Sequence, residues 1–288
     1  MTAAFALATS LMWGLADFGG GLLTRRMSAL TVVVVSQALA AVVLGAIVVA
    51  TGGWSEWGPQ LWYAVAAGVV GPVGMFAFYR ALSQGTMGVV SPLASLAVVV
   101  PVAAGLALGE RPGWMQGLGI VVAVAGVVLA GGPELRGAPV QRQTIALTLL
   151  SALGFGAVMA LIEHASSTLT GLFLALFVQR VTNVVAGGAV LLAQVGRGTA
   201  RMLPEGGAPV LTRALPALAF VGLADVAANG TYMLAAQGGP VTMAAVLASL
   251  YPVVTALAAR AVLKERLRLV QAAGAGLALA GTVLLATS

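Results

Sequence analysis

Long apolar runs separated by short polar connections dominate the chain. Each run has about 20 residues, the length that an α-helix needs to cross the hydrocarbon core of a bilayer. None shows the alternation over about ten residues that marks a membrane β-strand. The pattern predicts an all-α membrane protein with ten transmembrane helices. We expect these helices at residues 4–23, 30–51, 61–83, 89–108, 115–130, 144–162, 172–195, 214–236, 241–263 and 269–286.

The composition excludes a water-soluble fold. Hydrophobic residues make up 60% of the chain and charged residues only 8%, whereas soluble proteins average about 45–50% and about 25%. So few charges do not cover the surface of a soluble domain of this length. The first apolar run has no Lys or Arg before it, so we interpret it as a membrane helix and not as a cleaved signal peptide.

The chain also contains an internal repeat. Tyr79, Gln84 and Gly85 follow the same spacing as Tyr232, Gln237 and Gly238. Two further blocks match in the same order and with constant spacing: Glu110, Arg111, Gln116, Gly119, Gly126 and Leu129 with Glu265, Arg266, Gln271, Gly274, Gly281 and Leu284, and Gly14, Gln37 and Gly45 with Gly156, Gln179 and Gly187.

The repeat predicts a duplicated unit of five helices. Because five is odd, the second copy enters the membrane from the opposite side, which gives two inverted five-helix repeats. This arrangement is typical of secondary transporters, whose substrate site lies near the midplane where the repeats meet. We place the first repeat at residues 3–130, a linker at 131–143 and the second repeat at 144–286.

These residues resemble a known family. Trp13-Gly14, Tyr79 with Ala81-Leu82, and Glu110-Arg111 followed by Gln116 are similar to the EamA family of the drug/metabolite transporter superfamily. The second half repeats the pattern with Tyr251-Pro252, Glu265-Arg266 and Gln271. The resemblance covers nearly the whole chain and implies ten helices in two inverted halves. It also implies export or exchange of small metabolites, amino acids or drugs, without naming a substrate.

The orientation in the membrane has two conflicting indications. The odd-numbered loops, counted from the N-terminus, hold eleven Lys and Arg residues. The even-numbered loops and both tails hold only Arg111. The positive-inside rule therefore puts both termini outside the cytoplasm, whereas the family resemblance implies termini inside. The eleven are Arg25, Arg26, Arg80, Arg136, Arg142, Arg197, Arg201, Arg213, Lys264, Arg266 and Arg268.

The sequence gives no indication of an enzyme or a cofactor site. His164 is the only histidine and there is no cysteine, so no His-x-x-x-His metal pair or thiolate metal site is expected. Nucleophile-elbow and phosphate-loop patterns are absent from the sequence as well. The net charge of +6 comes without a basic, aromatic-rich patch, so nucleic acid is not an expected partner.

Two oppositely charged residues are expected near the membrane midplane. Asp225 and Arg180 enter their helices from opposite sides, and at 1.5 Å per residue their depths differ by about 5 Å. A charge at the centre of a membrane helix costs at least about 2.5–3.5 kcal/mol, so each needs a reason. They form either a substrate or proton site, or a structural ion pair.

Other polar and aromatic residues extend this candidate site. Asn229 and Tyr232 follow Asp225 by four and seven residues and share its helical face. Asp17 is a second candidate for a coupling proton, or else it pairs with an arginine at the end of its helix. Trp13, Tyr79 and Tyr251 are candidates for lining an aromatic substrate cavity, although a single aromatic residue of this kind is more often a packing residue than a ligand contact.

Two Glu-Arg pairs end the fourth and ninth expected helices. We interpret Glu110-Arg111 and Glu265-Arg266 as structural staples or gate latches and not as substrate contacts.

Together these features favour a multi-pass secondary transporter of the bacterial inner membrane. It moves a small amphipathic solute by alternating access, with proton coupling, as a monomer or homodimer in the lipid bilayer. The alternatives are a non-transporting membrane scaffold, whose polar groups pair internally, and a channel, which needs continuous polar rings. Neither a cofactor nor a metal is expected.

Overall fold

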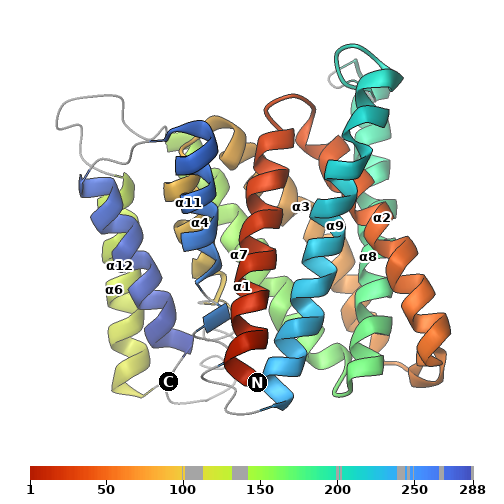
Figure 1. Cartoon of the computed structure of the whole chain (residues 1–288), viewed down its shortest axis with the longest axis horizontal. Coiled ribbons are helices and arrows are strands. Elements are labelled where there is room, and N and C mark those ends of the chain that lie inside the picture. The colour runs from red at the N-terminus through yellow and green to blue at the C-terminus, as the bar shows by residue number, and fades with distance from the viewer. Residues whose placement is uncertain are drawn as a thin grey trace.

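Figure 1 shows the fold as a computed structural model of the chain. The structure describes residues 1–98, 100, 113–131, 142–198, 201, 203–238, 244, 247–248, 250–265 and 269–286. Within these residues all regular elements are helical. They are α1 (Thr2–Leu23), α2 (Ala29–Thr51), η1 (Gly53–Glu56), α3 (Leu61–Gln84), α4 (Met87–Ala94), η2 (Ser95–Val98), α6 (Trp114–Gly131), α7 (Arg142–Ala165), α8 (Leu169–Gly196), α9 (Ala208–Gln237), α11 (Tyr251–Leu263) and α12 (Leu269–Ala286).

The helix lengths agree with the expectation of an all-helical membrane protein. In the described part of the chain, six helices are long and apolar enough to cross a bilayer: α1, α2, α3, α7, α8 and α9. Three shorter apolar helices lie at 87–97, 251–263 and 272–284. The expected fourth and ninth helices fall partly outside the described residues.

One expected connection is shorter in the structure. We expected a long loop from Gly196 to Arg213, but α9 already begins at Ala208. Pro209 lies in the first turn of α9, where its missing N–H has no helical acceptor to lose and its fixed φ suits the helix. The proline therefore lies within the first turn of the helix and does not belong to the loop.

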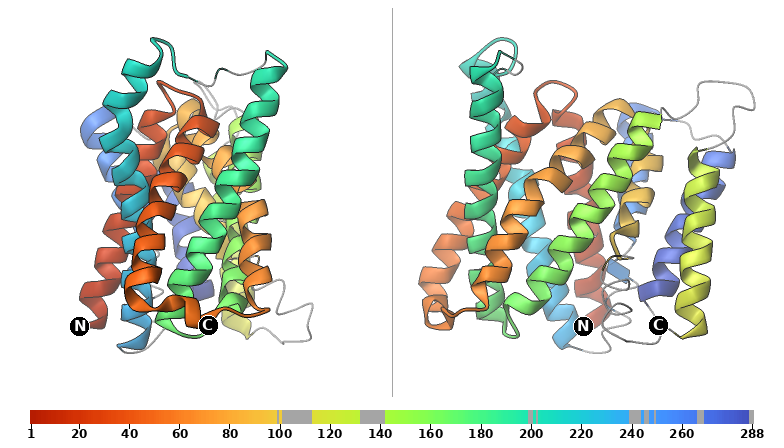
Figure 2. Two further views of the ribbon diagram at one scale, coloured as in Figure 1. Left: turned by 90° about the vertical axis from the view of Figure 1, so that its right-hand side faces the viewer. Right: turned by 180° about the vertical axis from the view of Figure 1, so that it is seen from behind.

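The helices pack in pairs across the two halves of the chain. α1 packs on α9 and α11, α2 on α8, α3 on α7 and α8, and α6 on α12. Figures 1 and 2 show α6 and α12 as a pair at one edge of the bundle. The first residues of α1 and the last of α12 lie at one end of the bundle, and the α1–α2 and α3–α4 connections lie at the other (Figure 1).

Local signals fix several helix ends. The Ser28 hydroxyl accepts a hydrogen bond from the Thr31 amide at the start of α2, and Thr168 caps α8 through the Gly171 amide in the same way. Each satisfies a backbone donor that the first helical turn leaves without a partner. Gly52 ends α2 in the left-handed conformation, at φ 67°, which glycine adopts at little cost.

The bundle interior is apolar around Phe78 and polar around α8 and α9. Phe78 is 2% exposed and packs with Val32, Val33, Leu82 and other apolar residues of α2, α3 and α4. The centre of α9 approaches α2 closely, since a Cβ on Gly222 would lie 2.3 Å from the Ser36 carbonyl oxygen. This close contact fixes α9 one turn before Asp225.

Candidate functional site

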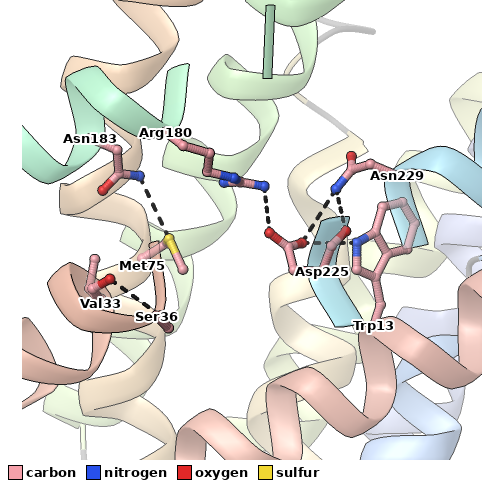
Figure 3. A network of polar contacts seen from close by, with 8 residues as sticks. All are labelled: Trp13, Val33, Ser36, Met75, Arg180, Asn183, Asp225 and Asn229. Carbon is pink, nitrogen blue, oxygen red and sulfur yellow. Dashed lines mark hydrogen bonds and ion pairs between the residues drawn. The ribbon is translucent and has the colours of Figure 1, made fainter. Parts of the chain in front are cut away.

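An ion pair lies at the centre of the bundle. The Arg180 Nη2 of α8 donates to the Asp225 Oδ2 of α9 at 2.5 Å (Figure 3). The Arg180 side chain is 7% exposed and the Asp225 side chain 24%. The structure thus brings together the two charges that the sequence places at similar depth, and it leaves the carboxylate partly accessible.

Two further side chains donate hydrogen bonds to Asp225. The Trp13 indole Nε1 of α1 donates to Asp225 Oδ1 at 3.2 Å. Asn229 Nδ2 donates to the Asp225 backbone oxygen at 2.7 Å and to its Oδ1 at 3.4 Å. Figure 3 shows these groups converging on the carboxylate from α1, α8 and α9. Both carboxylate oxygens are therefore already engaged.

Two aromatic rings pack around Trp13, whose indole binds Asp225. The Trp13 ring lies 6.1 Å from that of Tyr232 and 6.0 Å from that of Tyr251, centroid to centroid. Tyr79 of α3 contacts a different part of α1, because its ring packs against Gly20 and against Phe78. The structure therefore groups three of the four expected aromatic residues and places the fourth two helical turns along α1.

Asp17 lies beside this group and has a different environment. It is half-buried, and the described residues offer it no hydrogen bond or ion pair. Asp17 does not pair with Arg25, because Arg25 binds Glu265. Asp17 is close enough to Asp225, Tyr79 and Tyr251 to interact with them electrostatically.

Three buried amide side chains were not among the site residues predicted from the sequence. Gln37 and Gln179 served there only as repeat markers, and Asn183 was not considered. Gln37 is 0% exposed, Gln179 3% and Asn183 0%. Both amide atoms of Gln37, and the amide oxygens of the other two, lack hydrogen-bond partners within the described structure, as does Arg180 Nε. The available signal was the four-residue spacing of Gln179 and Asn183, which puts two amides on one face of α8.

Glu265 joins both halves of the chain at the opposite end of α1. Its Oε1 accepts from Arg25 Nη2 at 3.0 Å, and its Oε2 accepts from the Met87 backbone amide at 2.9 Å. The Met87 amide begins α4, so the carboxylate also lies at the positive end of a helix dipole. The expected partner Arg266, and the first pair Glu110 and Arg111, lie outside the described residues.

Comparison with known proteins decides the family. A sequence model of the EamA-like transporter family matches residues 1–132 and 142–287. The chain belongs to the EamA-like transporter family. EamA-like proteins are membrane transporters and not enzymes, and within the described residues no group of three or more His, Cys, Asp or Glu side chains is placed to hold a metal.

Other comparisons bear on the EamA-like fold alone. One solved structure, described only as a "Crystal structure of protein", is 15% identical, with 99% of this chain and 96% of that chain covered and a TM-score of 0.61. At this identity the likeness shows a shared fold. A search of curated proteins found no match.

Proposed function

We propose that the chain is a secondary transporter that exports or exchanges small amphipathic metabolites, amino acids or drugs by alternating access. Ten spans in two inverted five-helix repeats, residues 3–130 and 144–286 joined by 131–143, provide the two rocking halves. The antiparallel directions of α1 and α7, which begin these halves, support the inversion (Figures 1 and 2). The protein functions in the bacterial inner membrane as a monomer or homodimer.

The observation that carries this proposal is the ion pair between Arg180 and Asp225. Two charges inside a bilayer bundle face a large desolvation cost, which their attraction offsets only with good geometry and further hydrogen bonds. A purely apolar pair would often be as stable. Intramembrane charges of this kind are typical of substrate and ion pathways, and the partly exposed Asp225 carboxylate fits such a path.

Unpaired polar atoms disfavour the alternative of a membrane scaffold. A scaffold predicts that its buried polar groups are satisfied internally, because an unsatisfied group costs about 1–3 kcal/mol. Here both amide atoms of Gln37, the amide oxygens of Gln179 and Asn183 and the Nε of Arg180 are buried without partners within the described structure. They supply donors and acceptors for a solute or for water in the transport cycle.

The residues at the centre of the bundle limit the range of solutes that it suits. Arg180 is already neutralised by Asp225, so phosphorylated or multiply anionic solutes find little compensating charge. The surrounding aromatic rings favour a small molecule with an apolar part, as in most ligand sites. Asp17 and Asp225 are the carboxylates proposed to carry a coupling proton.

The direct test is a counterflow screen. Purified protein is reconstituted into liposomes preloaded with single amino acids, amines or purines, and uptake of the labelled compound is measured. We expect accelerated uptake for at least one compound, unchanged in Glu205→Gln, which alters only an exposed ion pair with Arg201. Folded, inserted protein without counterflow for any class would favour the scaffold.

A further inference from the structure

The charges at the centre of the bundle do not balance. Arg180 forms an ion pair with Asp225, and Asp17 adds a second carboxylate without a partner among the described residues. Among the described residues, the helices packed on α1 supply no other facing charge there. Arg80 of α3, Arg213 of α9 and Arg260 of α11 are exposed, and Met87–Ala94 of α4 contains no titratable residue. With both carboxylates ionised, the centre carries one excess negative charge.

An excess charge in this position requires a cation. An ionised carboxylate inside a bilayer bundle is costly unless it is paired. A proton is the simplest partner, and any other must come from outside the protein. Asp225 does not serve this purpose, because Arg180 occupies one of its oxygens and Trp13 and Asn229 the other.

Two tyrosines approach α1 before and after Asp17, one through its backbone and one through its ring. Gly14 and Gly20 lie three residues before and after it. A Cβ on Gly14 would lie 2.7 Å from the Tyr251 carbonyl oxygen, and one on Gly20 would lie 2.4 Å from the Tyr79 ring. Trp13 precedes Asp17 by four residues and shares its helical face. Glycine at these positions thus lets the Tyr251 backbone and the Tyr79 ring approach α1 on either side of Asp17.

This surrounding suits an organic cation better than a metal ion. Faces of Trp and Tyr rings attract ammonium groups electrostatically, because their π systems are electron-rich. Hard metal ions prefer several oxygen ligands, and no such cluster occurs within the described residues. A single free carboxylate among aromatic rings matches one positive charge on an apolar body.

We propose that Asp17 binds the ammonium group of the transported solute, which is a monovalent organic cation with an apolar body. This inference rests on the proposed transport function and names its substrate class. The protonated carboxyl of Asp17 releases its proton as the ammonium binds, so the centre stays neutral in both forms. One proton leaves for each cation that enters.

Binding to the purified full-length protein in detergent tests this without requiring transport. The probes are benzyltrimethylammonium and phenylmethanesulfonate, which have similar size and shape but opposite charge. Isothermal titration calorimetry at mildly alkaline pH gives affinity, and a pH indicator in weak buffer gives proton release. We expect binding of the cation alone, weakened by about tenfold or more, about 1.4 kcal/mol, in Asp17→Asn.

Two control variants separate charge from folding. Asp17→Glu keeps the carboxylate and should retain most of the binding. Glu205→Gln removes an exposed carboxylate and should bind as the wild type does, with the same proton release. Proton release should disappear in Asp17→Asn.

The outcomes distinguish this inference from the proposed function. Equal binding of cation and sulfonate, no binding of the cation, or unchanged binding in Asp17→Asn would overturn the assignment of Asp17. Counterflow of a neutral or anionic solute that persists in Asp17→Asn would overturn the substrate class and leave transport standing. Cation binding through Asp17 without any counterflow would overturn transport and leave the cation site standing.

Discussion

Replacing Glu265 by Gln should loosen one end of the bundle. The Glu265 carboxylate binds Arg25 at the end of α1 and the Met87 amide at the start of α4. It therefore ties a helix of the second half to two helices of the first. Gln keeps the size of the side chain and one acceptor oxygen but removes the charge.

The size of the effect follows from these two contacts. The Arg25 side chain is 33% exposed and that of Glu265 12%, so the ion pair contributes about 0.2–1 kcal/mol, as exposed pairs do. A negative charge at a helix N-terminus adds about 0.3–1 kcal/mol. Glu265→Gln should thus lower the free energy of unfolding by about 0.5–2 kcal/mol. Arg25→Gln should cost less, because the contact with α4 survives.

SDS unfolding in mixed micelles measures these differences, and a double-mutant cycle isolates the ion pair. Glu205→Gln is the control, because its partner Arg201 is 3.6 Å away and both side chains are highly exposed, at 89% and 79%. We expect no measurable loss there. Equal stabilities of Glu265→Gln and Glu205→Gln would refute the reasoning, as would a coupling energy of zero between Arg25 and Glu265.

Three other predictions follow from close contacts, buried amides and loop charges. Gly20→Ala should destabilise the protein by about 1–3 kcal/mol through overpacking against the Tyr79 ring. The added methyl group in Gly188→Ala meets nothing within 4 Å, so this control should be neutral or stabilising in the same thermal unfolding assay in detergent. Gln37→Leu should preserve or raise stability, because it removes two buried unsatisfied atoms, and reduce counterflow; lost folding or full counterflow would contradict this. Single cysteines at 52–60 and 131–143, in a chain without native cysteine, should react with an impermeant maleimide on intact cells only at 52–60, and labelling at 131–143 alone would reverse the orientation.

Much of the fold follows from hydrophobic pattern. The expected bounds of α3 and α12 match the structure to within one residue. Polar residues at both ends of an apolar run leave little choice for where the helix begins and ends. The predicted start of α9 is six residues too late. A segment with Pro209 and Arg213 resembles a loop in sequence, because a proline is favoured in a helix only in its first turn. The number of spans stays a prediction, because parts of the fourth and ninth fall outside the described residues.

The site was less accessible to sequence reasoning. Depth along a helix is readable from sequence, which is why Arg180 and Asp225 were matched correctly. The rotation of one helix about its axis relative to its neighbours is not readable from sequence. The hydrogen bond from the Trp13 indole to Asp225 and the buried amides of Gln37 and Asn183 are therefore visible only in the structure. Glu265 stands next to Arg266 in sequence, yet its observed partner is Arg25, 240 residues away. The contact with Arg25 is therefore one that proximity in sequence does not indicate, whereas the expected contact with Arg266 stays a prediction.

Counterflow by Asp225→Asn tests the central claim most directly. The variant leaves Arg180 without its anion, so expression should fall in part and counterflow should be lost, while Arg180→Gln added to it should recover folding without transport. Counterflow that persists while pH-driven accumulation disappears would instead make Asp225 the coupling carboxylate. The measurement is the initial rate of labelled uptake per reconstituted protein, against wild type and Glu205→Gln. Wild-type counterflow together with wild-type pH-driven uptake in Asp225→Asn would contradict a transport site at this ion pair.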